Sequence, residues 1–72
     1  MLIINRPDDE HVEVYLKTSK DLVYISQANH DEDGWVGIER IEAMARRMAR
    51  AMKIDLEEVS DETFGVNAKY ID

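Results

Sequence analysis

Cysteine is absent from this chain of 72 residues, and proline occurs once, at Pro7. Without cysteine the chain can form neither a disulfide nor a thiolate metal site, which excludes the cross-linked class of small secreted domains. The same absence is typical of a reducing compartment, and no basic start followed by a long apolar stretch resembles a secretion signal. We therefore expect the protein in the cytoplasm.

Long apolar runs are absent as well, because the longest are Met1–Ile4 and Leu22–Ile25. A membrane-spanning helix needs about 20 apolar residues, so no membrane contact is expected. The composition is 44% hydrophobic and 35% charged, which is too apolar for a disordered chain and predicts one folded domain, residues 1–72. The net charge of −7 repels nucleic acid over most of the surface, so nucleic acid is not the expected partner.

Residues that could carry catalysis are sparse. None of the three serines lies in a Gly-x-Ser-x-Gly motif, and the three glycines are too scattered to form a phosphate-binding loop. His11 and His30 are candidate general bases, but a chain of this length has little room to enclose a substrate pocket of about 300 Å³. The sequence therefore predicts a protein that is not an enzyme and that uses no cofactor.

The first half of the chain has the pattern of β-strands. Apolar and polar residues alternate over His11–Lys17, and the β-branched and aromatic segment Leu22–Gln27 follows a turn-rich stretch, which predicts an antiparallel hairpin. Met1–Ile4 can add an edge strand. The polar segment Asn29–Gly34 is predicted to be a turn before a short third strand, Trp35–Ile38.

The segment after Ala28 resembles the first half of an EF-hand calcium loop. Asn29, Asp31 and Asp33 match its oxygen ligands, and Gly34 matches its glycine. The twelfth position, where that family has a bidentate glutamate, is Arg40. The expectation is therefore no metal site.

From Glu39 to Lys53 the pattern becomes helical. At about 100° per residue, one arc collects the apolar side chains of Ile38, Ile41, Met44, Ala45, Met48, Ala49, Ala51 and Met52. This stripe is predicted to pack on the sheet, although its methionines also suit an adaptable contact surface. A capping-box pattern predicts a second short helix over Asp55–Glu62, and Phe64–Ile71 is either a last strand or a frayed end.

The predicted fold class is α+β: a small antiparallel meander of two or three strands packed by one amphipathic helix, with a short C-terminal helix or strand. One helix covers only one face of a sheet. Tyr15, Leu22, Tyr24 and Trp35 are predicted on strand faces opposite the core. They are either scattered surface aromatics or a self-association surface, and the second reading predicts a homodimer.

Charge is segregated along the chain. Residues 1–37 carry a net charge of −5, residues 38–54 a net charge of +3, and residues 55–72 a net charge of −5. Arg46, Arg50 and Lys53, here called the basic ridge, recur at i, i+4 and i+7 along one helix face. The basic ridge is either an ordinary solvated face or a docking site for an acidic surface on the chain itself, a second copy or a partner.

The predicted function is a non-enzymatic, small acidic protein that binds another protein and forms a homodimer. Its candidate partner-binding residues are Arg46, Arg50, Lys53, Tyr15, Tyr24 and Trp35. Two alternatives stay open. The composition is similar to that of phage-encoded inhibitors of host nucleases, which implies acidic side chains that mimic nucleic-acid phosphates: Asp8, Asp9, Glu10, Asp31, Glu32, Asp33, Glu57, Glu58, Asp61 and Glu62. The other is weak nucleic-acid binding through Arg46, Arg47, Arg50 and Lys53.

Overall fold

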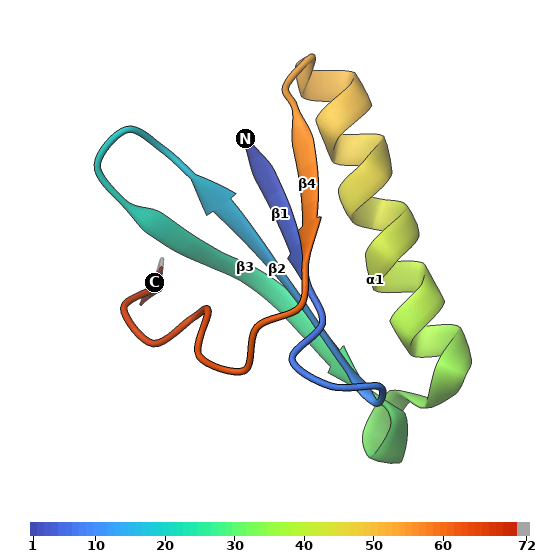
Figure 1. Ribbon diagram of the computed structural model, residues 1–72. Helices are drawn as coiled ribbons and strands as arrows, with labels where there is room; N and C mark the ends of the chain where they lie inside the picture. The colour runs from blue at the N-terminus through green and yellow to red at the C-terminus, as the bar shows by residue number, and fades with distance from the viewer. Residues whose placement is uncertain (71–72) are drawn as a thin grey trace.

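The computed structural model describes residues 1–70 and contains five strands and one helix (Figure 1). In chain order these are β1 (Leu2–Asn5), β2 (His11–Lys17), β3 (Leu22–Asn29), α1 (His30–Met52), β4 (Leu56–Val59) and β5 (Lys69–Tyr70). The strands form one sheet in the order β4-β1-β2-β3-β5. The α+β class is confirmed, but the sheet is mixed, because β4 runs parallel to β1 and β5 runs parallel to β3.

The predicted hairpin is confirmed. Strands β2 and β3 pair antiparallel, with a bulge opposite the Val14/Tyr15 step, and the Thr18 hydroxyl closes the turn by accepting the Asp21 N–H at 3.0 Å. Alternation places Val12 and Val14 in the core.

Strand β1 is an interior strand and not the predicted edge. It lies between β4 and β2, and all four of its residues are buried. A run of consecutive buried residues is typical of a strand that is covered on both faces, which explains why β1 does not alternate.

The predictions for residues 29–38 are wrong, because helix α1 already begins at His30. Asn29 caps it: its side-chain oxygen accepts the Glu32 N–H at 2.9 Å, while the Asp33 carboxylate accepts the Asn29 N–H at 3.0 Å. Gly34 has φ +68° and kinks the helix after this first turn. A positive φ at an Asp-Gly pair is typical of a tight turn, but here Gly34 joins two helical segments.

The predicted helix at residues 55–62 is also wrong. Residues Leu56–Val59 form β4, and this strand is bounded by two backbone hydrogen bonds, Leu2 N–H to Asp55 C=O at 2.8 Å and Arg6 N–H to Val59 C=O at 2.9 Å. Pairing with the buried strand β1 outweighs the local capping pattern. Of the two readings of the C-terminal segment, a strand forms only at Lys69–Tyr70, and Ile71 lies outside the described residues.

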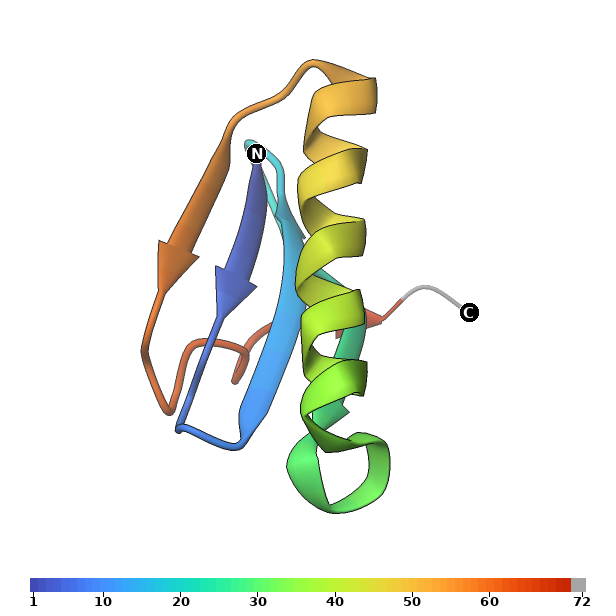
Figure 2. The ribbon, with the colours of Figure 1, turned by 90° about the vertical axis from the view of Figure 1, so that its right-hand side faces the viewer.

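Helix α1 covers one face of the sheet (Figure 2). The core between them contains Leu2, Ile4, Val12, Val14, Ala28, Ile38, Ala45 and Ala49. Ala45 and Ala49 are buried as the apolar stripe predicts, while Met52 at its end is 51% exposed. Within residues 1–70, no helix is both long enough and apolar enough to cross a membrane.

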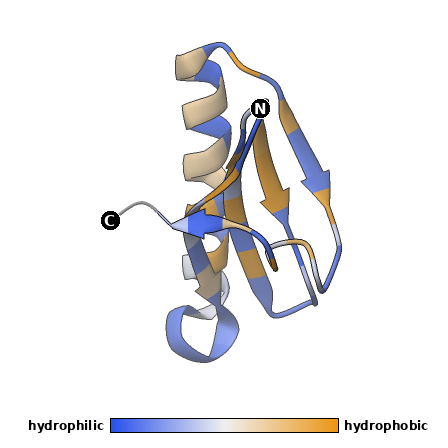
Figure 3. Ribbon diagram, turned by 90° about the vertical axis from the view of Figure 1, so that its left-hand side faces the viewer, coloured by the Kyte–Doolittle hydropathy of each residue, from blue (hydrophilic) through white to orange (hydrophobic). Residues whose placement is uncertain are grey.

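The chain's own C-terminal segment crosses the other face of the sheet (Figure 3). The ring of Phe64 lies 5.3 Å from that of Tyr15, and Tyr70 lies 4.9 Å from Tyr24 between ring centroids. Gly65 packs so tightly that a Cβ there would clash with the Tyr15 hydroxyl. As a result Tyr15 is 3% exposed, and the chain itself covers this part of the face.

Asn5 fastens this segment to the sheet from a position that is 0% exposed. Its amide nitrogen donates to the Glu13 carboxylate at 2.8 Å and to the Asp61 carbonyl at 3.0 Å. Its amide oxygen accepts the Asp61 N–H at 3.0 Å. Asn5 therefore satisfies both backbone groups of Asp61 in the way that a neighbouring strand does.

We predict that Asn5→Ala lowers the free energy of unfolding by about 2–3 kcal/mol, because three hydrogen bonds worth about 1 kcal/mol each are lost at a buried position. Urea denaturation followed by circular dichroism measures this loss. The control is Ser60→Ala, which removes one exposed hydrogen bond, from the Ser60 hydroxyl to the Arg6 carbonyl at 2.8 Å, and should cost less than about 1 kcal/mol. Equal losses in the two variants would contradict the role of Asn5.

Candidate functional site

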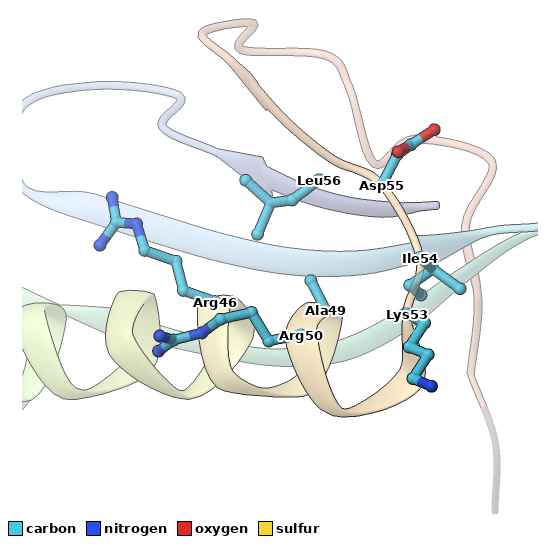
Figure 4. Close-up of a pocket in the computed structure, with 7 residues that line it drawn as sticks. All are labelled: Arg46, Ala49, Arg50, Lys53, Ile54, Asp55 and Leu56. Carbon is cyan, nitrogen blue, oxygen red and sulfur yellow. The ribbon is translucent and has the colours of Figure 1, made fainter.

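The last turns of α1 and the start of β4 flank an open surface groove of about 610 Å³ (Figure 4). Its lining consists of Arg46, Ala49, Arg50, Lys53, Ile54, Asp55 and Leu56, and these residues are here called the α1–β4 groove. The sequence predicted little room to enclose a substrate pocket of about 300 Å³. The groove is not enclosed, because two elements flank it and its remaining side is open to solvent.

The turn after α1 creates the groove. The Lys53 N–H bonds to the Arg50 carbonyl at 3.2 Å, and the Ile54 N–H bonds to the Ala49 carbonyl at 3.0 Å, which is the Schellman pattern of a helix end. The chain then reverses, and β4 runs back as the edge strand beside β1 (Figure 1). Ala49, Ile54 and Leu56 give the groove an apolar floor.

Lys53 occupies the left-handed position of this turn, with φ 56° and ψ 44°. Glycine is the usual residue there, because a side chain in this conformation costs about 1–2 kcal/mol. A lysine in place of glycine adds an ammonium group to the lining of the groove. Local strain is thus retained at a position that supplies a charge.

Arg46 is the basic-ridge residue whose charge is already paired. Its guanidinium lies 3.2 Å from the Glu58 carboxylate, and Arg6 donates to the same oxygen at 2.8 Å. The hydrogen bond from Arg6 is the main cause that holds the pKa of Glu58 below its usual value. Arg6 also pairs with Glu42 on α1, so this network joins β1, β4 and the helix.

Arg50 and Lys53 have no such partner. Neither side chain forms an ion pair with any of residues 1–70, and both residues are exposed. In Figure 4, Arg46 and Arg50 extend from the helix in the same direction, while Lys53 points away from the sheet. Asp55 is the one acidic residue in the lining, so the groove carries excess positive charge in a chain whose net charge is −7.

The structure separates the predicted aromatic residues from the basic ridge and from one another. Tyr15 is buried under Phe64 and Gly65, and this burial, with the Glu13 carboxylate nearby, raises the pKa of its hydroxyl. Tyr24 is half-buried beside Tyr70.

Trp35 lies on α1 instead of a strand. It is 53% exposed, and its ring packs at a tilt against that of His30, with 4.2 Å between centroids. It is therefore the most accessible of the three predicted aromatic contact residues.

Sequence reasoning found the basic ridge but missed the other side of the groove. Ile54, Asp55 and Leu56 reach it only because β4 pairs with β1, which is a contact between distant parts of the chain. The Leu-Glu-Glu-Val sequence of β4 carries a weak β signal that the capping-box pattern obscured.

The groove lining contains no histidine and no hydroxyl group, and it offers one carboxylate, that of Asp55. In the part of the chain that the structure describes, no three histidine or carboxylate side chains lie close enough to hold a metal ion together. No protein-family model, curated protein or solved structure matches this chain. The functional assignment therefore rests on the chemistry of the groove, which combines an apolar floor with two unpaired cations.

We predict that Lys53→Gly raises the free energy of unfolding by about 1 kcal/mol, because glycine adopts the left-handed conformation without strain. Urea denaturation provides the measurement. Lys53→Ala is the matched control, since it removes the same charge but keeps the strained backbone. If Lys53→Gly were no more stable than Lys53→Ala, the strain assigned to Lys53 would be absent.

Proposed function

We propose that this protein is a non-enzymatic domain of the cytoplasm that binds another protein, and that the α1–β4 groove receives an acidic part of that partner. The observation that carries the proposal is the pair of cations, Arg50 and Lys53, which lack acidic partners within residues 1–70 and flank an apolar floor. Burying the floor supplies affinity, and the two cations supply selectivity for negative charge.

The charge of the rest of the molecule supports the same reading. A partner with an acidic surface is repelled by most of this chain, whose net charge is −7, and is attracted where the basic ridge lies. Electrostatics of this kind orients two proteins before contact. The attraction acts over about 10 Å at an ionic strength of 0.1 M, so it weakens as salt increases.

A nucleic-acid mimic is the second candidate, because the structure gathers acidic residues at one end of the molecule. The His30 N–H donates to the Glu10 carbonyl at 2.9 Å, which brings Asp8–Glu10 beside Asp31–Asp33 at the start of α1. All six of these residues are exposed. In this alternative the acidic end, and not the groove, contacts the partner. Direct nucleic-acid binding by the ridge is opposed by the net charge.

We predict that the double reversal Arg50→Glu with Lys53→Glu abolishes capture of partner proteins from host lysate and leaves the far-UV circular dichroism spectrum unchanged. The reason is that both unpaired cations of the groove become anions. Quantitative mass spectrometry of captured proteins provides the measurement, and raising salt from about 0.05 M to 0.5 M should weaken capture by the parent protein.

The control changes the total charge by the same amount at a distant site. Lys17→Glu with Lys20→Glu alters two exposed residues beside the β2–β3 turn and should leave capture intact. Loss of the same partner in both double variants would show a general charge effect and contradict the groove. Capture that survives both reversals, but fails when Asp31, Glu32 and Asp33 become Asn, Gln and Asn, would favour the mimic.

A second copy of the chain is another candidate partner, and an exposed apolar pair favours it. Trp35 and Val36 are 53% and 60% exposed on α1. If they form a self-association surface, light scattering at tens of micromolar should give about twice 8.4 kDa, and Trp35→Ala should shift the protein to a monomer. A monomeric parent at these concentrations would refute the homodimer.

A further inference from the structure

Strand β4 lies at the end of the sheet, and no other strand pairs with its outer side within residues 1–70. In a parallel ladder, alternate residues direct their backbone groups to the same neighbour. The carbonyls of Asp55 and Val59 bond to β1, and Leu56 is aligned with Leu2. The backbone N–H and C=O groups of Leu56 and Glu58 therefore face away from β1.

The groove lies directly beside this edge. Leu56 packs against the core on the helix side of β4, and it lines the groove together with Arg46 and Arg50 of α1 (Figure 4). A strand added to β4 would direct alternate side chains over the groove. One extended segment can thus form hydrogen bonds with the free backbone groups of β4 and also place acidic side chains near the cations of the groove.

We propose that the partner binds as an extended segment that adds a sixth strand to β4, with acidic and apolar side chains on the face that covers the α1–β4 groove. This inference rests on the proposed function and specifies the form of its partner. Main-chain hydrogen bonds to Leu56 and Glu58 supply affinity, while Arg50 and Lys53 select the side chains. The opposite face of the added segment lies beside Glu57, which favours basic or neutral residues there.

The sequence of β4 argues against a second copy as the added strand. If β4 paired antiparallel with β4 of another copy through the outward-facing backbone groups, Leu56 of one copy would lie opposite Glu58 of the other, and Glu57 would lie opposite Glu57. Like charges that face each other across two strands destabilise the pair. The expected occupant is therefore a segment of a different protein.

Two synthetic peptides of identical composition test the pattern. In acetyl-Thr-Asp-Lys-Leu-Thr-Asp-Lys-amide, both aspartates share a face with the leucine, whereas in acetyl-Thr-Lys-Asp-Leu-Thr-Lys-Asp-amide the lysines take that face. Seven extended residues span about 23 Å, enough to cover β4 and the groove. Calorimetric titration should show the first peptide binding at least tenfold more tightly than the second, and Arg50→Glu with Lys53→Glu should abolish the difference.

Backbone methylation tests strand addition itself. A single N-methyl group on the leucine blocks one edge of the first peptide, and one on the following threonine blocks the other edge. Binding should survive one of these modifications and be lost with the other, because only one edge faces β4. In parallel, amide hydrogen exchange should slow at Leu56 and Glu58 on binding and stay unchanged at Glu57 and Val59, which already face β1.

Failure of this inference is distinguishable from failure of the proposed function. If the peptide binds and depends on Arg50 and Lys53, but the two methylated forms behave alike, the groove binds acidic groups without strand addition. Absence of peptide binding at millimolar concentration also overturns strand addition, while partner capture that still requires Arg50 and Lys53 preserves the proposed function. If reversal of Arg50 and Lys53 leaves capture unchanged, the proposed function fails as well.

Discussion

The buried amide of Asn5 is the contact on which both layers of this molecule depend. A sheet has two faces, and a chain of 72 residues with one long helix can cover one of them with that helix. The other face carries Ile3 and Tyr15, which would remain exposed without a second cover. Asn5 binds both backbone groups of Asp61 and so directs the C-terminal segment across that face. Phe64 and Gly65 then complete the cover over Tyr15.

The same attachment determines where β4 lies. This strand is held at its start by the turn at Lys53 and beyond its end by the bonds between Asp61 and Asn5. Pairing with β1 aligns Leu56 with Leu2 and Val59 with Asn5. Because both ends are held, β4 has a defined position at the edge of the sheet, and the groove between its start and the last turns of α1 is a consequence of the fold.

The sequence predicted those elements whose pattern is local. Alternation over His11–Lys17 was sufficient for the hairpin, and the apolar stripe was sufficient for the main part of α1. The helix start was missed because its two determinants, the Asn29 cap and the positive φ of Gly34, are equally typical of a turn. Strand β4 was missed because its partner β1 lies more than 50 residues away in the chain.

The same difference between local patterns and long-range contacts applies to the candidate site. Arg46, Arg50 and Lys53 share a helix face, so their spacing alone was enough to predict a basic ridge. The strand that turns this ridge into one wall of a groove depends on long-range pairing, as do the salt bridges of Glu58 that leave Arg50 and Lys53 as the free charges. The aromatic residues show the converse case, since alternation predicted the face of Tyr15 but could not predict that residues 64 and 65 cover it.

The acidic residues of β4 have two physical effects that act together. Glu58 forms ion pairs with Arg6 and Arg46 and thereby joins the strand to the helix. Glu57 and Glu58 also place negative charge on an edge strand, which discourages pairing between copies of an already acidic chain. A segment with neutral or positive charge on the face away from the helix avoids repulsion by Glu57, and on the helix side Glu58 is already paired with Arg6 and Arg46. The charge that protects this edge from self-pairing therefore also restricts which foreign segment can bind it.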